Sequence, residues 1–137
     1  MSQSPLDLKP LQNALMRLKE GYARYQLDTS DSQIRDGLIQ RYEFTYEISH
    51  KMLKRYLERT SANPQLFDDM QFADLIRSGN EQSLLQSNWS SWKIFREMRA
   101  KTSHTYDESV AQKVVTVIPD FIEEVSFFYA QLLLRHA

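Results

Sequence analysis

Three side chains suited to phosphodiester chemistry lie close together in the sequence: Arg99, His104 and Tyr106. A histidine whose pKa lies near neutrality can take the proton from a ribose 2′-hydroxyl or give one to a leaving 5′-oxygen. An arginine can hold a phosphate and stabilise the charge of the transition state with its planar set of donors. Such chemistry needs no metal ion, and no tight cluster of Asp, Glu and His predicts a metal site or another cofactor.

The residues around Arg99 add positive charge. Arg96 and Lys101 flank it, and only Glu97 opposes them. Because the 17 Lys and Arg are balanced by 18 Asp and Glu, any affinity for nucleic acid has to come from such a local basic patch. An ordinary solvated helix end, where cations are favoured, is the structural alternative for this cluster.

The expected geometry decides whether Arg99 and His104 can act together. In an unbroken helix, residues five positions apart face directions about 140° apart, which would separate the two side chains. If the helix instead ends near Lys101, the chain can turn His104 back toward Arg99 or toward the same segment of a second subunit. The segment therefore predicts a site in a cleft at a helix junction, with a dimer axis as one location for it.

The start of the last helix is predicted from a capping-box pattern, Thr105 followed three residues later by Glu108. This pattern puts His104 just before the helix and Tyr106 in its first turn. Exposed backbone N–H groups at such a helix start favour an anion such as phosphate.

The elements that must position these residues are helices, because apolar residues recur at steps of three and four along most of the chain. Long stripes run over residues 8–25, 34–56 and 110–132, with Ile118 and Leu133 expected to widen the last one. Two shorter helices are predicted near residues 72–76 and 88–101.

Prolines and glycines refine the helix ends. Pro5 suits the first turn of the first helix, Gly79 is expected to stop the short helix, and Pro119 is expected to kink the last helix without ending it. Only three glycines and four prolines occur in 137 residues, which favours long uninterrupted helices. The predicted fold is an all-α, four- to five-helix antiparallel bundle with an apolar face wide enough for a homodimer.

Length and composition set further limits. A chain of 137 residues predicts a single domain over residues 1–137. Without any cysteine, disulfides, zinc–thiolate sites and cysteine nucleophiles are excluded. The N-terminal residues lack the features of a secretory signal, and no apolar run is long enough to span a membrane, so we expect a cytoplasmic protein without membrane contact.

Two blocks of sequence resemble a known family. HEPN domains of the HepT-like group share a short signature: an arginine, then a histidine after four intervening residues, then a tyrosine after one more. Arg99, His104 and Tyr106 match this signature. Residues 41–58 are similar to the long second helix of the small proteins described as nucleotidyltransferase substrate-binding, although those relatives commonly have Trp where this chain has His50. The polar Ser103 also suits the motif. Together the blocks and the helix order cover nearly the whole chain.

The resemblance implies the toxin of a toxin–antitoxin pair: a metal-independent endoribonuclease that acts as a homodimer. Arg99 and His104 of both subunits would form the catalytic site, with Arg96, Lys101 and Ser103 supporting RNA binding. A partner minimal nucleotidyltransferase would neutralise the toxin by transferring AMP to Tyr106, adding bulk and negative charge that repel an RNA phosphate. Blockade by partner binding alone is the alternative to this modification.

Other interpretations of the sequence are kept beside this one. The chain could be a non-catalytic substrate-binding subunit of a two-component nucleotidyltransferase, or a structural dimerisation module. His50 is expected to pack and His136 to lie at a frayed terminus. Glu43 and Glu47 are expected to make ion pairs, either within their helix, as Glu47 with Lys51, or across the cleft to orient Arg99. For Trp89, Trp92 and Phe95, helical spacing favours a core or dimer-interface role over a base-stacking platform.

Overall fold

The structure, a computed structural model, describes residues 5–135 and is built from helices alone in that range. Five α-helices and two short 3₁₀ helices follow one another along the chain: α1 (Lys9–Leu27), α2 (Ser32–Thr60), η1 (Pro64–Phe67), α3 (Phe72–Glu81), α4 (Trp89–Ala100), η2 (Thr102–His104) and α5 (Glu108–Leu134). The all-α prediction is confirmed.

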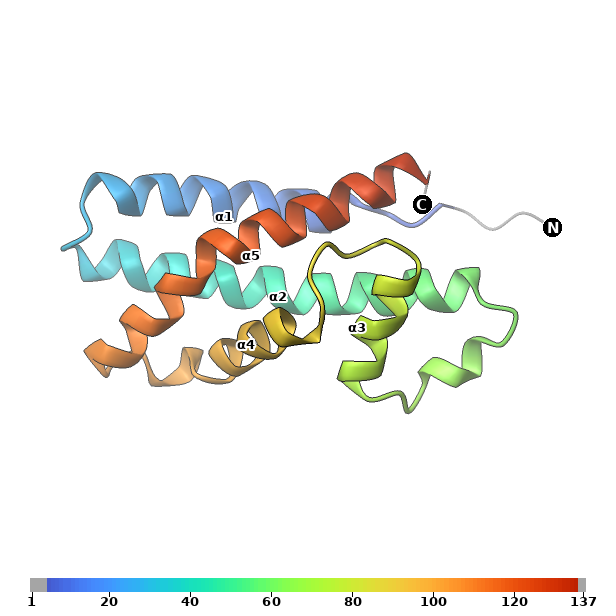
Figure 1. Ribbon diagram of the computed structural model, residues 1–137. Helices are drawn as coiled ribbons and strands as arrows, with labels where there is room; N and C mark the ends of the chain where they lie inside the picture. The colour runs from blue at the N-terminus through green and yellow to red at the C-terminus, as the bar shows by residue number, and fades with distance from the viewer. Residues whose placement is uncertain (1–4, 136–137) are drawn as a thin grey trace.

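The long helices form an antiparallel bundle around α2. Helices α1 and α2 make a hairpin, and α5 returns obliquely across both of them (Figure 1). Helix α4 packs on α2 and α5, and the short α3 lies between the C-terminal half of α2 and α4. The end of α4 with Arg99, and the turn to α5 with His104 and Tyr106, therefore lie beside α2 rather than in an isolated loop.

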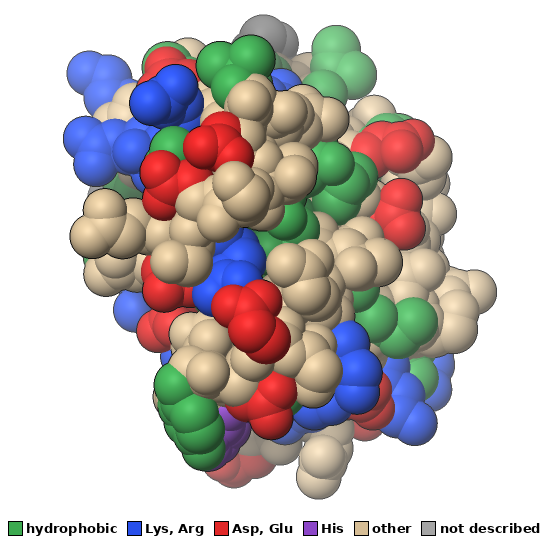
Figure 2. Space-filling view, turned by 90° about the vertical axis from the view of Figure 1, so that its left-hand side faces the viewer, with side chains coloured by type: hydrophobic (Ala, Val, Ile, Leu, Met, Phe, Trp, Pro, Cys, Tyr) green, Lys and Arg blue, Asp and Glu red, His purple; other side chains and the backbone are tan. Residues whose placement is uncertain are grey.

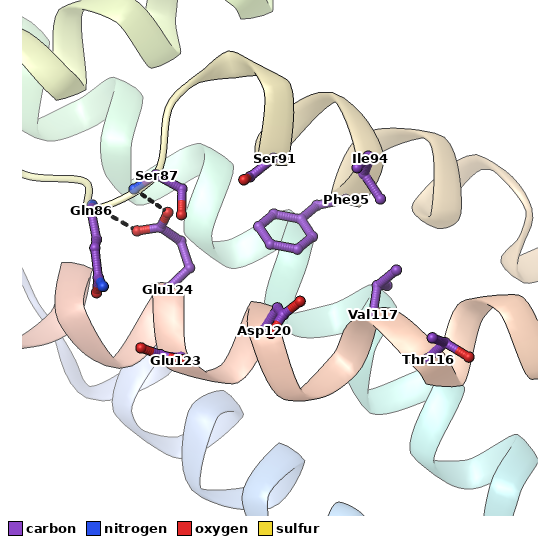
Figure 3. Close-up of a pocket in the computed structure, with 10 residues that line it drawn as sticks. All are labelled: Gln86, Ser87, Ser91, Ile94, Phe95, Thr116, Val117, Asp120, Glu123 and Glu124. Carbon is purple, nitrogen blue, oxygen red and sulfur yellow. Dashed lines mark hydrogen bonds between the residues drawn. The ribbon is translucent and has the colours of Figure 1, made fainter.

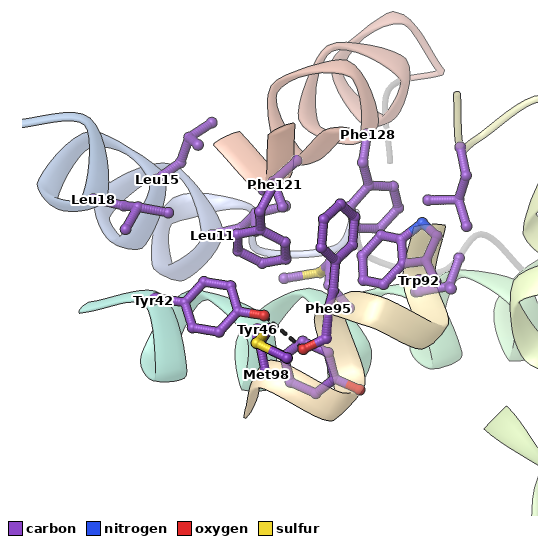
Figure 4. Close-up of a cluster of buried hydrophobic side chains, with 14 of the residues drawn as sticks. Leu11, Leu15, Leu18, Tyr42, Tyr46, Trp92, Phe95, Met98, Phe121 and Phe128 are labelled. Atoms are coloured by element: carbon purple, nitrogen blue, oxygen red, sulfur yellow. Dashed lines mark hydrogen bonds between the residues drawn. The ribbon is translucent and has the colours of Figure 1, made fainter. Parts of the chain in front are cut away.

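The predicted apolar faces meet in one core. Figure 4 shows the leucines of α1 facing aromatic side chains from α2, α4 and α5. Trp92 and Phe95 are buried there, as their spacing predicts, and the hydroxyl of Tyr42 donates a hydrogen bond to the backbone carbonyl of Phe95 at 2.5 Å. This bond fixes α4 against α2, so it also fixes the distance between the side chains that these helices present at their exposed edge.

Several predicted helix ends are wrong for identifiable reasons. Pro5 lies outside α1, which begins at Lys9 with Pro10 in its first turn. Gly79 does not stop α3, which continues to Glu81. Gly79 is buried inside the helix instead, and it leaves no room for a side chain, because a Cβ there would lie 2.9 Å from the Cδ1 atom of Leu85. Its role is close packing, not termination.

The start of α5 also differs from the prediction. Asp107, not Thr105, is the N-cap, and its carboxylate accepts hydrogen bonds from the backbone N–H groups of Ser109 at 2.9 Å and Val110 at 3.4 Å. Tyr106 consequently precedes the helix rather than lying in its first turn. Glu108 does not cap the helix, because its carboxylate accepts hydrogen bonds from Arg35 on α2 instead.

The rest of α5 follows the predicted stripe. The helix runs through Pro119 without ending, and Ile118 is completely buried. Leu133 was expected on the apolar face, but it is 49% exposed. His136 lies outside the described residues. No helix between residues 5 and 135 has the length and apolar character that crossing a membrane requires.

Candidate functional site

The predicted helix junction exists, and the chain changes direction within a few residues. Helix α4 ends at Ala100, Lys101 caps it, and the 3₁₀ helix η2 follows. The N–H of His104 donates to the carbonyl of Lys101 at 3.0 Å, and the N–H of Asp107 donates to the carbonyl of His104 at 3.1 Å. His104 is thus held by backbone hydrogen bonds on both sides, in a turn whose shape does not depend on its side chain.

Arg99 is oriented by two carboxylates of α2. Its Nε and Nη2 groups both donate to Oε1 of Glu47, at 2.9 and 2.5 Å, and Nη2 lies 3.7 Å from Oε1 of Glu43. The Arg99 side chain is 30% exposed. Its Nη1 group donates to none of the residues that the structure describes. One edge of the guanidinium is therefore fixed and the other is available to a ligand.

Thr102 couples this ion pair to the turn. Its hydroxyl lies 2.8 Å from both Oε2 of Glu43 and the backbone carbonyl of Arg99, and the residue is only 8% exposed. Glu43 thus contacts Arg99 with one oxygen and Thr102 with the other. Of the two alternatives for Glu43 and Glu47, the structure selects orientation of Arg99, and it records no Glu47–Lys51 pair among residues 5–135.

His104 and Tyr106 are presented to solvent on the same turn. Both side chains are exposed, Tyr106 to 87%, and their ring centroids lie 6.1 Å apart. Within the described part of the chain, neither side chain is hydrogen-bonded to Arg99. The chain therefore brings the three motif residues to one region, but they do not all contact one another.

The supporting residues lie around this turn. Arg96 is exposed on α4, and its guanidinium carbon lies over the ring of Phe72, 5.5 Å from the centroid. Lys101 is half-buried and Ser103 is exposed. Figure 2 views the bundle from the end where the α4–α5 turn lies and shows acidic and basic side chains interspersed, without one large basic patch.

A small pocket adjoins Arg99, and the sequence alone did not identify it. It has a volume of about 270 Å³ and is lined by residues of α2, α3 and α4: Tyr46, Glu47, His50, Phe72, Arg96, Arg99 and Ala100. His50 packs edge-on against Phe72 with centroids 4.5 Å apart, which confirms its packing role, yet it also faces this pocket. Burial, and then the nearby charge of Arg96, keep the pKa of His50 below its usual value. The helical spacing of Glu47 and His50, which puts both on one face of α2, was the available signal for this pocket.

Arg35 is a residue near the α4–α5 turn that the sequence alone did not single out. It is 6% exposed, and its Nη1 group donates to both carboxylate oxygens of Glu108, at 2.8 and 2.7 Å. These hydrogen bonds raise the pKa of Arg35 above its already high value. The pair ties the beginning of α5 to the beginning of α2, and it thereby fixes the far side of the turn that holds Tyr106.

A pocket larger than the one beside Arg99 lies on the other side of α4, and one of its lining residues has a structural role. It measures about 310 Å³ and lies between α4 and α5 (Figure 3). At its edge the carboxylate of Glu124 accepts hydrogen bonds from the backbone N–H groups of Gln86 at 2.8 Å and Ser87 at 2.7 Å. Glu124 thereby holds the α3–α4 connection against α5. No group of three or more His, Asp and Glu side chains in residues 5–135 is arranged to hold a metal ion.

Comparisons with known proteins identify the family of this chain. Residues 6–133 match the family model described as nucleotidyltransferase substrate binding protein like. A Haemophilus influenzae protein named probable ribonuclease HepT is 35% identical in an alignment 144 residues long, gaps included. The alignment covers 99% of this chain and 98% of that protein.

Two solved structures share the fold. HI0074 from Haemophilus influenzae, described as the fold of a substrate binding domain of a nucleotidyltransferase, superimposes with a TM-score of 0.86 at 34% identity over 92% of this chain and 98% of its own. A Thermus thermophilus protein superimposes with a TM-score of 0.71 at 26% identity over 89% of this chain and 98% of its own. The match of family model, sequence and fold over nearly its whole length shows that the chain belongs to the HepT-like family of nucleotidyltransferase substrate binding proteins.

Proposed function

We propose that this chain is a metal-independent endoribonuclease and the toxin half of a pair with a minimal nucleotidyltransferase antitoxin. The observation that carries the proposal is the α4–α5 turn, where an exposed histidine follows an arginine with one free guanidinium edge. The 35% identity to a probable ribonuclease HepT supports the same activity. We propose further that residues 1–137 act as one HEPN domain in the cytoplasm.

In the proposed reaction, the ribose 2′-oxygen attacks the adjacent phosphorus and the bond from phosphorus to the 5′-oxygen breaks. A base takes the proton of the 2′-hydroxyl, and an acid gives a proton to the leaving 5′-oxygen. The exposed imidazole of His104 can do either, but one imidazole cannot do both in a single step. A second copy of the chain would supply the second imidazole, which is why we propose that the active form is a homodimer with both turns facing one cleft.

Arg99 would stabilise the charge on the phosphate in the transition state. Its Nε edge is held by Glu47, so the Nη1 donors can meet the phosphate without losing the fixed orientation. A preorganised donor of this kind contributes more than a mobile one because no reorganisation is needed at the moment of reaction. Arg96, Lys101 and Ser103 would support binding of the neighbouring part of the RNA.

Tyr106 is the proposed site of neutralisation. Its hydroxyl oxygen would attack the α-phosphorus of ATP bound to the partner, forming a phosphodiester to AMP and releasing pyrophosphate. A side chain that is 87% exposed can reach the active site of a partner protein without unfolding of its own turn. With a ring centroid 6.1 Å from that of His104, an attached AMP would put negative charge where the RNA phosphate has to bind.

The proposal is tested by RNA cleavage in EDTA. Purified chain, free of the partner and with its unmodified mass confirmed, should cut RNA and leave 2′,3′-cyclic phosphate ends. A His104→Ala variant should fold normally and lose the activity, because the side chain of His104 is exposed and its turn is held by backbone bonds. Equal cleavage by this variant would refute the assignment of His104.

A second function is favoured by one observation, that HI0074 was described as a substrate binding domain of a nucleotidyltransferase. In this alternative the chain is non-catalytic and presents a substrate, or Tyr106 itself, to the partner. It predicts a stable complex with the nucleotidyltransferase and no cleavage by the wild-type chain under any condition. Incubation of the complex with labelled ATP, using wild-type chain and Tyr106→Phe, shows separately whether Tyr106 accepts the nucleotide.

A further inference from the structure

The pocket between α2, α3 and α4 has features of a ligand subsite that the proposed reaction does not use. Its volume of about 270 Å³ lies just below the range of pockets that hold whole small molecules, so it suits one planar group of a larger ligand. Arg99, which would hold the scissile phosphate, is part of its lining. A ligand group in this pocket would therefore be the one attached next to that phosphate.

The ring of His50 supplies hydrogen-bonding groups to this pocket. The imidazole is half-buried against Phe72, and neither of its nitrogens is hydrogen-bonded to another described residue. Because burial and Arg96 hold the pKa of His50 below its usual value, the ring is neutral near pH 7 and offers one donor and one acceptor. Unused donors and acceptors at a half-buried position are suited to reading the edge of a polar ring.

Arg96 supplies a surface for stacking. Its guanidinium lies over the buried ring of Phe72, which restricts its position, while the Arg96 side chain itself stays exposed. Guanidinium planes stack with nucleobases in single-stranded RNA recognition. The ring of Phe72 is 7% exposed and is not available for stacking, so Arg96 forms the outer layer of this arrangement.

We propose that this pocket binds the nucleobase adjacent to the scissile phosphate, with the base stacked on Arg96 and its edge hydrogen-bonded to His50. The inference rests on the proposed function and adds a substrate class to it: single-stranded RNA read at one base beside the cut. A neutral base fits better than a second phosphate, because the carboxylate of Glu47 lies in the same lining and offsets the charge of Arg99.

The test separates binding from cleavage. The probe is a short labelled single-stranded oligonucleotide carrying 2′-O-methyl groups, which the proposed reaction cannot cut, in four versions that each contain one type of base. Binding is measured by fluorescence anisotropy to wild type, His50→Phe and Arg96→Gln. The phenylalanine keeps the ring contact with Phe72 and removes the nitrogens. Lys19→Gln on α1 is the matched control, since it removes the same charge from an exposed position away from the pocket.

Arg96→Gln should weaken binding of all four probes about tenfold through loss of the stacked cation. His50→Phe should reduce the ratio between the best- and worst-bound base by about fivefold, the effect expected of one hydrogen bond. Lys19→Gln should stay within about twofold of wild type. Wild-type affinity of both pocket variants, with the base preference unchanged in His50→Phe, would overturn the inference.

Together with the RNA cleavage assay in EDTA, applied to wild type and the same variants, this binding experiment distinguishes the inference from the proposed function. If the pocket variants lose binding as expected but wild type cuts no RNA, the ribonuclease proposal fails and the base-binding pocket stands. If wild type cuts RNA and both pocket variants bind and cut like Lys19→Gln, the pocket proposal fails alone. Thermal unfolding of His50→Phe, measured beside wild type, tests whether the variant retains the packing against Phe72.

Discussion

Arg99 and Glu124 are both charged side chains at helix contacts, but their surroundings differ. Glu124 is 2% exposed, and each of its carboxylate oxygens accepts a hydrogen bond from one backbone N–H group. Arg99 is 30% exposed at its side chain, and only the Nε and Nη2 groups are engaged by described residues. A buried charge is tolerated when its hydrogen-bonding capacity is met inside the fold. The comparison indicates that Glu124 stabilises the chain, whereas Arg99 keeps capacity for a ligand.

The largest separation of these two roles should come from Arg99→Gln. RNA cleavage should fall at least about 100-fold, the loss seen when one preorganised donor to the transition state is removed. The free energy of unfolding should change by less than about 1 kcal/mol, because the ion pairs with Glu47 and Glu43 are partly exposed to solvent. Cleavage kinetics and urea unfolding of one preparation test both statements. A large loss of stability with unchanged cleavage would reverse the assignment.

Glu124→Ala should do the opposite. Removing the carboxylate takes away two charge-assisted hydrogen bonds to the α3–α4 connection, and we expect the free energy of unfolding to fall by about 3 kcal/mol. The matched control is Glu123→Ala, an exposed neighbour on the same helix, with an expected change within about 0.5 kcal/mol. Equal stabilities of the two variants in urea unfolding would contradict a structural role for Glu124.

A smaller effect is expected at Glu47, where Ala and Gln variants separate positioning from charge. Both hydrogen bonds from Arg99 go to the same oxygen, Oε1, so the amide oxygen of Gln can accept them in the same geometry. We predict that Glu47→Ala lowers kcat about tenfold through a misplaced Arg99, and that Glu47→Gln restores most of it. Equal losses in the two variants would show that the negative charge matters rather than the position.

The smallest effect should be a pH dependence of stability caused by His50. Since the pKa of His50 is lowered in the folded chain, the unfolded chain binds this proton at higher pH than the folded chain does. The free energy of unfolding should therefore fall as the pH falls from about 6.5, the usual histidine value, through the lower folded pKa. Below that pKa this contribution is fully lost.

Urea unfolding of wild type and His50→Phe above and below this pH range measures the effect. The variant should lose part of the acid destabilisation. His104→Phe, which replaces an exposed histidine, should keep it. Identical pH profiles for wild type and His50→Phe would mean that burial of His50 does not affect its protonation.

Local patterns predicted the helices well and their ends less well. The apolar stripes of α1, α2 and α5 mark the buried faces because a spacing of three and four residues puts side chains on one side of any helix. The ends depend on competition between neighbours. Thr105 and Glu108 form a plausible capping box, yet Asp107 is the stronger N-cap and Arg35, 73 residues away, binds Glu108. No local pattern contains that distant partner.

The candidate site divides in the same way. Arg99, His104 and Tyr106 could be grouped from the sequence, because their spacing and the break after α4 are local properties of the chain. For Glu43 and Glu47, the sequence could not choose between an ion pair within α2 and orientation of Arg99. It also did not identify the pocket that His50 and Arg96 line. Those contacts join helices whose mutual position is set by packing of the whole core, and such long-range packing has no signature in a short stretch of residues.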